Sequence, residues 1–179
     1  MEKGLAIVGI LGAIAATLTI LNVLQAVASF LVLPIIVAGS IVLVAQRTMA
    51  GAVAGLLVLS LAVVTALGLA GSITTESGTT DFGFSAEAGR VLAIAGCLSI
   101  PLAAIAVRWH HIDPQSLAYV GLFCGAVAFL LAIIRSDPLA DQANPVTLAI
   151  AVLPLGAIAS MVGLWRGADL AEPPTPAVP

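Results

Sequence analysis

The sequence predicts an all-α integral membrane protein: a polytopic bundle of six transmembrane helices with both termini in the cytoplasm. Of its 179 residues, 61% are apolar and only 8% are charged, and the mean hydropathy is +1.20. A soluble domain is about half apolar and about a quarter charged. A domain of this size would leave much of that apolar surface in water. The charged residues also stand between long apolar runs, so lipid is the predicted solvent for most of the chain.

The first two helices come from one apolar run. No charged residue occurs between Gly4 and Ala45. A single helix over that run would be about 63 Å long, whereas the hydrocarbon core of a bilayer is only about 30 Å thick. The run must therefore fold back on itself. Asn22 and Gln25 are its only amide side chains, so the hairpin is predicted between them, with spans over residues 4–22 and 25–46.

A short polar break, Gln46-Arg47-Thr48, separates the second span from the third. Thr48 is the predicted N-cap, the third span covers about residues 49–69, and Gly71 is predicted to end it. Residues 72–84 form the longest polar segment between spans. Ser85 is the predicted N-cap of the fourth span, which continues from residue 86 to Arg108.

The last two spans each follow a capping residue and a proline, Asp113-Pro114 and Asn144-Pro145. Proline suits the first helical position because its missing N–H has no intrahelical partner there. The fifth span is predicted to end at Arg135 and the sixth near Arg166. The chain thus divides into a bundle over residues 1–166 and a Pro-rich cytoplasmic tail over residues 167–179, which is predicted to be extended.

The basic residues indicate the orientation. With six spans, four of them fall on the side of both termini: Lys3, Arg47, Arg108 and Arg166. Only Arg90 and Arg135 fall near the other side. Lys and Arg favour the cytoplasm, so both termini are predicted inside, and Trp109 and Trp165 stand where an inner aromatic belt is expected. A five-span arrangement would place Lys3 opposite Arg166 and lose this division.

The sequence offers no set of residues for chemistry inside the membrane. Ionisable residues at membrane depth mark proton relays and ion paths, and the predicted spans hold none away from their ends. His110 and His111 are the only histidines, and with Asp113 they supply too few well-placed ligands for a zinc site. Cys97 and Cys124 lie at different predicted depths and are expected to be free thiols. We therefore expect no enzyme activity, no metal and no cofactor, and the few basic residues argue against nucleic acid as a partner.

Two kinds of residue inside the spans are candidates for a structural role. Small-residue pairs four apart permit close contact between helices, and the third and fifth spans carry one pair each: Gly51 and Gly55, and Gly121 and Gly125. These glycines are predicted to mark helix-packing faces, within the chain or between chains. Prolines that free a carbonyl and kink a helix are predicted in three spans, at Pro34, Pro101 and Pro154.

Two functional classes remain on the sequence alone. The first is a non-catalytic accessory, assembly or regulatory subunit that packs in the lipid bilayer against a membrane-protein partner or another copy of itself. The second is a passive transporter or channel for a small neutral solute, with the prolines around a narrow path. The excess of Arg over Lys and the abundance of Ala, Val, Leu and Gly suggest the plasma membrane of a prokaryote. Whether the predicted outer segment 72–84 binds a ligand is left open by its composition.

Overall fold

A computed structural model describes residues 1–21, 25–74, 86–134 and 145–171. These residues form six α-helices and one 3-10 turn, and no strand occurs among them. The elements in chain order are α1 (Glu2–Ile20), α2 (Gln25–Ala45), α3 (Met49–Thr74), α4 (Ala86–Arg108), η1 (Trp109–His111), α5 (Gln115–Ile134) and α6 (Pro145–Ala171). The prediction of an all-α fold is confirmed.

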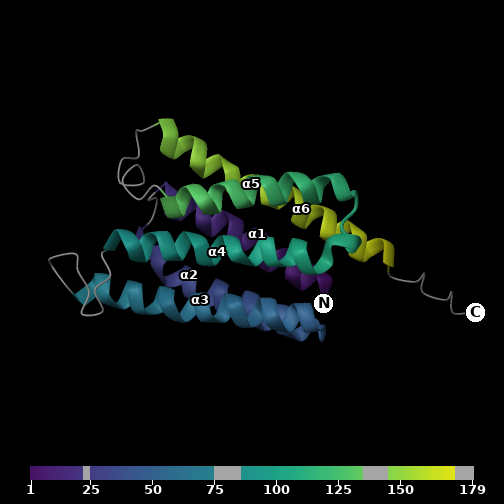
Figure 1. The fold of residues 1–179 in the computed structure, drawn as a ribbon, viewed down its shortest axis with the longest axis horizontal. Helices are drawn as coiled ribbons and strands as arrows, with labels where there is room; N and C mark the ends of the chain where they lie inside the picture. Colours follow the sequence, from purple (N-terminus) through teal and green to yellow (C-terminus); the bar gives the residue numbers. More distant parts are fainter. Residues whose placement is uncertain (22–24, 75–85, 135–144, 172–179) are drawn as a thin grey trace, which may run out of the picture.

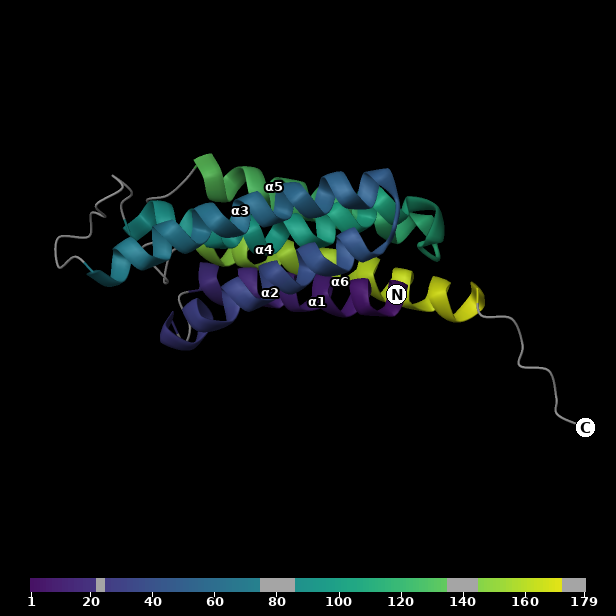
Figure 2. The ribbon, with the colours of Figure 1, turned by 90° about the horizontal axis from the view of Figure 1, so that it is seen from below.

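The six helices lie side by side in two layers, as Figures 1 and 2 show. One layer holds α3, α4 and α5, and the other holds α2, α1 and α6. Successive helices run in opposite directions along the long axis (Figure 1). The start of α1, the α2–α3 turn, η1 and the end of α6 therefore gather at one end of the bundle. We call this end the basic end, because it carries Lys3, Arg47, Arg108 and Arg166.

Helix α4 lies at the centre of the bundle and contacts all five other helices. Its side chains supply much of the core, and those of Ile94, Cys97, Leu98, Ile100 and Ile105 have no exposed surface. Large apolar residues with more than a third of their surface exposed occur on each of the other five helices, but not on α4. The neighbours of α4 thus shield it from the surroundings, and their outer faces carry apolar side chains.

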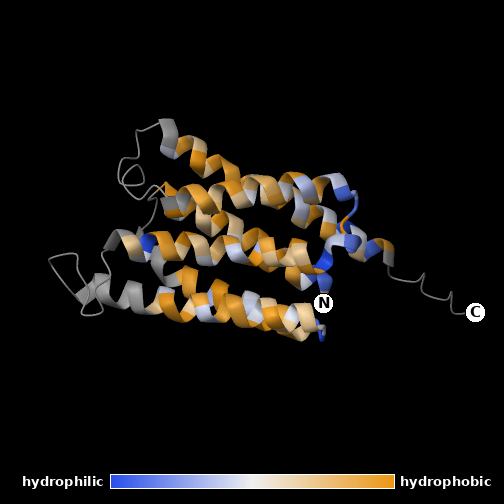
Figure 3. Ribbon diagram, in the orientation of Figure 1, coloured by the Kyte–Doolittle hydropathy of each residue, from blue (hydrophilic) through white to orange (hydrophobic). Residues whose placement is uncertain are grey.

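Apolar residues make up most of the helices, as Figure 3 shows, and large apolar side chains occur among both the buried and the exposed residues. Four helices are long and apolar enough to cross a bilayer: α1, α3, α4 and α6. Within the described residues, α2 and α5 contribute shorter apolar stretches, Leu31–Ala45 and Gln115–Leu131. Exposed leucine, isoleucine and valine side chains around a helical bundle are what a lipid environment requires. The chain is therefore an integral membrane protein.

Several predicted helix ends are wrong. Gly71 does not end the third helix, since α3 continues to Thr74. The sixth helix passes its predicted end at Arg166 and reaches Ala171, with Asp169 in its last turn 2.6 Å from the ammonium of Lys3. That ion pair and the contact with η1 give the last turn of α6 tertiary partners, which composition alone does not reveal. Helix α1 begins at Glu2, two residues earlier than predicted.

The predicted cap at the start of α3 is confirmed. The Gly51 N–H donates to the Thr48 hydroxyl oxygen at 3.0 Å, and the Ala52 N–H donates to the Thr48 carbonyl at 2.9 Å. Arg47, just before the cap, has a φ of 54° and so adopts a left-handed backbone conformation. The described residues do not include the predicted caps Ser85 and Asn144, the predicted hairpin at 22–24 or Arg135.

Candidate functional site

The first predicted glycine pair lies at the contact between α3 and α2. A Cβ atom on Gly51 would stand 2.6 Å from the carbonyl oxygen of Leu43, and one on Gly55 would stand 2.9 Å from that of Ser40. Both distances are too short for a side chain, so the absence of one lets the two backbones approach closely. The pair is therefore used within the chain, and the opposite face of α3 is the one exposed to the surroundings.

The second glycine pair lies between α5 and its neighbours in the same chain. Gly121 faces the Ser160 side chain of α6, and Gly125 faces Leu102 of α4. The Ser160 hydroxyl donates a hydrogen bond to the Leu117 carbonyl of α5. Because this hydroxyl is fully buried, the bond satisfies a polar group that would otherwise be costly in an apolar core. The small glycine and the bonded serine together hold α5 against α6.

The three prolines lie inside α2, α4 and α6, and each helix continues past its proline. Pro101 has no N–H, so the carbonyl of Cys97 loses its usual intrahelical donor. That carbonyl oxygen would be only 2.6 Å from a Cβ on Gly12, which places it directly against α1. Near Pro154, the carbonyl of Ala151 accepts a hydrogen bond from the Thr17 hydroxyl at 3.2 Å. Helix α1 thus contacts the turns that precede two of the prolines.

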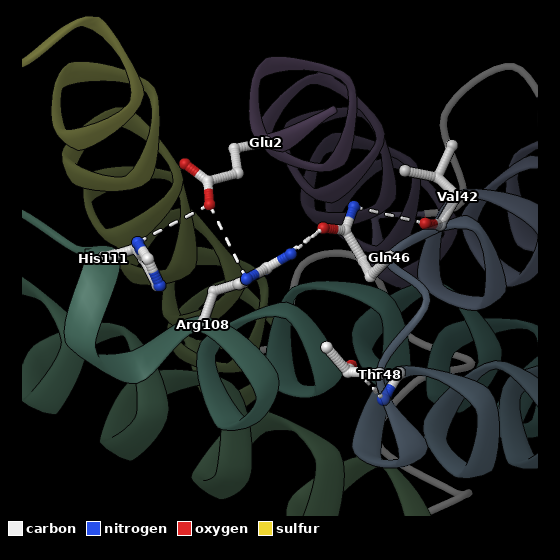
Figure 4. Close-up of polar contacts among 7 residues, drawn as sticks. Glu2, Val42, Gln46, Thr48, Arg108 and His111 are labelled. Carbon is white, nitrogen blue, oxygen red and sulfur yellow. Dashed lines mark hydrogen bonds and ion pairs between the residues drawn. The ribbon is translucent and has the colours of Figure 1, made fainter. Parts of the chain in front are cut away.

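A network of polar side chains from four elements closes the basic end of the bundle (Figure 4). The Arg108 guanidinium of α4 donates two hydrogen bonds to the Gln46 side-chain oxygen, one of them from Nε at 3.1 Å. Its Nη1 lies 3.7 Å from the Glu2 carboxylate of α1. The same Glu2 oxygen lies 3.6 Å from Nδ1 of His111 in η1. We call these four residues, Glu2, Gln46, Arg108 and His111, the end network.

Three residues of the end network, Gln46, Arg108 and Glu2, are mostly shielded from the surroundings. Gln46 is 6% exposed, and its Nε2 donates to the Val42 carbonyl at 3.3 Å, so both ends of its amide are bonded. The side chains of Arg108 and Glu2 are 18% and 19% exposed. Hydrogen bonds to a charged group stabilise a fold more than neutral ones, and an orphaned buried partner is costly. The network therefore ties α1, α2, α4 and η1 together.

The side chains of the end network contact one another. Its carboxylate, guanidinium and amide are oriented toward one another. A general base must lie within reach of a proton on a bound substrate. The pocket at this end of the bundle is bordered by His111 but by neither Glu2 nor Arg108.

The segment that carries the two histidines is held against α6. The Asp113 N–H donates to the Gly163 carbonyl at 3.1 Å, and a Cβ on Gly163 would stand 2.8 Å from the Asp113 carbonyl oxygen. Gly167, one turn later, lies directly against the His111 carbonyl. Gly163 and Gly167 thus form a third pair with the spacing of the two predicted ones, and the sequence analysis did not single them out as a pair.

An open pocket of about 610 Å³ lies where this segment meets α5 and α6. Its polar border consists of His110, His111, Asp113 and Gln115, and Leu170 of α6 forms part of its wall. Among the described residues, no group of three or more His, Cys, Asp or Glu side chains could hold a metal ion. The structure therefore brings His110, His111 and Asp113 to one pocket without arranging them as metal ligands.

Arg90 holds the opposite end of α1. Its guanidinium donates to the carbonyls of Thr19 and Ile20, both at 3.2 Å. These carbonyls belong to the last turn of α1, whose partial negative charge favours a cation. Both cysteines are free, with Cys97 buried and Cys124 partly buried against Gly156. Arg90 is thus hydrogen-bonded to the end of α1, and the two thiols pack between helices.

Sequence reasoning did not find the end network. The sequence pattern places Gln46 in a polar break and gives no role to Glu2. A usable signal did exist, because polar residues at the ends of α1, α2 and α4 must meet once those helices pack as neighbours. No protein-family model, curated protein or solved structure compared with the chain matches it.

Proposed function

We propose that the chain is a non-catalytic, six-span subunit of a prokaryotic plasma membrane that packs against another membrane protein. The observation that carries the proposal is the filled apolar interior of the bundle. The largest buried side chains are leucine, isoleucine and methionine: Leu5, Ile20, Ile36, Leu43, Ile94, Leu98, Ile100, Ile105, Ile150, Met161 and Leu164. Such an interior favours a packing role.

The buried hydroxyls support the same role. The Thr65 hydroxyl donates to the Leu92 carbonyl at 3.2 Å, and the Ser40 hydroxyl donates to the Val37 carbonyl at 2.8 Å. A path for a neutral solute needs polar groups that are free to bind the solute. These two hydroxyls are instead bonded to helix carbonyls, which favours the accessory role over the passive transporter or channel.

Helix length supports six spans. Helices α2 and α5 contain 21 and 20 residues, which corresponds to about 30 Å each and matches the hydrocarbon thickness of a bilayer. Both lie beside the four longer apolar helices in the two-layer bundle (Figure 1). If α1, α3, α4 and α6 cross the membrane, α2 and α5 must cross as well, because they return the chain to the other side.

The basic end supports an orientation with both termini inside. Four basic residues gather there, and Lys and Arg favour the cytoplasmic face. Trp109 also packs edge-to-face against Tyr119, with ring centroids 4.7 Å apart, and Trp165 lies half-exposed at the same end. Aromatic residues at this level are typical of the membrane–water interface.

The outer face of α3 is the surface that we assign to the partner. Only 28% of its apolar window is buried, whereas the other three candidate spans are 50% to 56% buried. The exposed side chains on this face are large and apolar: Val53, Leu56, Leu57 and Val63. Helix α3 contacts only α2 and α4 among the described helices, apart from minor contacts, so one side of it is uncovered.

A matched pair of tryptophan variants tests the proposal. The substitution Leu57→Trp enlarges the outer face of α3 at a position that is 65% exposed, and the control Val152→Trp does the same on α6 at 63%. Lipid accommodates a larger side chain, whereas a packed protein interface does not. After mild detergent extraction from the native membrane and mass spectrometry, we expect a stoichiometric partner with the wild type and with Val152→Trp, and loss of it with Leu57→Trp.

Two results would contradict the accessory role. Recovery of the wild type only as a homo-oligomer would replace the foreign partner with a second copy of the chain. Flux of a small neutral solute into liposomes that contain the purified chain alone would favour the transporter instead. Equal partner recovery with Leu57→Trp and Val152→Trp would place the contact on a face other than that of α3.

A further inference from the structure

We propose that the pocket beside η1 binds the phosphoethanolamine headgroup of a membrane phospholipid. The pocket has a volume of about 610 Å³, within the range of sites that hold small molecules. It lies at the basic end, next to Trp109 and close to the level at which an aromatic belt meets lipid headgroups. A lipid headgroup is therefore a ligand that a pocket at this level meets.

The pocket has fixed walls. Ile112 is 3% exposed and anchors the segment between η1 and α5. The hydrogen bond from the Asp113 N–H to the Gly163 carbonyl and the close contact of Gly167 with the His111 carbonyl hold this segment on α6. A binding site benefits from such pre-organisation because less freedom is lost when the ligand binds.

The polar border of the pocket matches a zwitterion. Asp113 offers a carboxylate for an ammonium group. His110 and Gln115 offer N–H donors for a phosphate, whereas Nδ1 of His111 faces Glu2. Leu170 and Pro114 give the same pocket apolar surface for the glycerol end of the lipid.

The same border selects among phospholipids. A phosphoglycerol headgroup carries no ammonium, so its phosphate would meet the Asp113 carboxylate with no compensating positive charge. A phosphocholine headgroup carries a positive charge but no N–H, so it cannot donate a hydrogen bond to that carboxylate. Phosphoethanolamine supplies both the charge and the donors, and the proposal therefore predicts a preference among lipids with identical acyl chains.

The test compares two aspartate variants of the full chain in detergent. Native mass spectrometry measures the binding of phosphatidylethanolamine, phosphatidylcholine and phosphatidylglycerol to the wild type, Asp113→Asn and Asp169→Asn. Asp169 is an exposed carboxylate at the same end and is bonded to Lys3, outside the pocket border. We expect Asp113→Asn to weaken phosphatidylethanolamine binding about tenfold, the effect of losing one charge-assisted hydrogen bond. Asp169→Asn should bind as the wild type does.

Competition with soluble compounds identifies the source of the phosphate. Soluble phosphoethanolamine that displaces the lipid, while inorganic phosphate at the same concentration does not, would support the proposal. Equal binding of the three lipids by the wild type would overturn it. An equal loss in Asp113→Asn and Asp169→Asn, or full displacement by inorganic phosphate alone, would overturn it as well. The folded state of each variant is checked by circular dichroism, since a loss of fold would reduce the binding of every lipid equally.

Discussion

The contact between α1 and α4 at Gly12 provides the sharpest test of the packing described above. The substitution Gly12→Ala would place a Cβ 2.6 Å from the Cys97 carbonyl oxygen, about 0.8 Å short of the 3.4 Å at which ordinary contact begins. The obstacle is backbone in the middle of a buried helix, so no side chain can rotate away. Helices α1 and α4 must separate locally.

The control for this variant lies in the same helix. Gly4→Ala introduces the same side chain where nothing lies within 4 Å. Alanine is preferred over glycine by about 1 kcal/mol in a helix interior, where Gly12 lies, whereas Gly4 lies in the first turn of α1. Any difference in this preference favours Gly12→Ala, so a lower stability of Gly12→Ala reports the steric term. Overpacking a core costs about 1–3 kcal/mol, so Gly12→Ala should be less stable than Gly4→Ala by about that amount.

The assay is reversible unfolding in mixed micelles of a mild detergent and dodecyl sulfate, followed by circular dichroism. We expect Gly4→Ala to unfold at the same dodecyl sulfate fraction as the wild type or a higher one, and Gly12→Ala to unfold at a lower one. If Gly12→Ala matched Gly4→Ala, the close approach of α1 to the Cys97 carbonyl would be refuted.

Two further predictions concern the basic end. Arg108→Met removes both donors to the buried Gln46 oxygen and should lower the free energy of unfolding by about 1–3 kcal/mol. The double variant Arg108→Met/Gln46→Leu has no side-chain amide without a partner at this position. In the same dodecyl sulfate titration it should be more stable than Arg108→Met alone. A still lower stability of the double variant would contradict the pairing of Arg108 with Gln46. Arg47→Gly should raise the melting temperature in detergent, because glycine adopts the left-handed backbone conformation without strain. The expected gain in the free energy of unfolding is about 1 kcal/mol. Arg47→Ala keeps the conformational requirement and should give no gain, so an equal rise in both would exclude strain as the cause.

The sequence was sufficient for the positions of most helices. Apolar runs bounded by polar breaks placed the starts of α3 and α6 at Met49 and Pro145, where the structure has them. The length of a bilayer core was enough to divide the first run into α1 and α2. The errors lie at helix ends that depend on tertiary contacts. Composition predicted an end near Arg166, whereas the contact of Asp169 with Lys3 accompanies a longer helix.

The candidate site was less predictable because it depends on which helices are neighbours. The spacing of Gly51 and Gly55 indicated a packing face, but only the structure shows that α2 occupies it. In the same way, Pro101 indicated a freed carbonyl, and nothing in the sequence named Gly12 as the residue that meets it. Arg108 and Gln46 are 62 residues apart, so their hydrogen bonds follow from the arrangement of helices and not from any local pattern.

The pairing of α1 with α6 has a consequence for synthesis. Helix α1 is synthesised before α6 and packs against it, through the hydrogen bond from the Thr17 hydroxyl to the Ala151 carbonyl and the ion pair of Lys3 with Asp169. The side of α1 that faces α6 must therefore stay covered by lipid or by an insertion factor until α6 has been synthesised. A nascent chain that stops before residue 145 would leave the α6-facing side of α1 without its partner, even if α4 had already packed in the centre of the bundle.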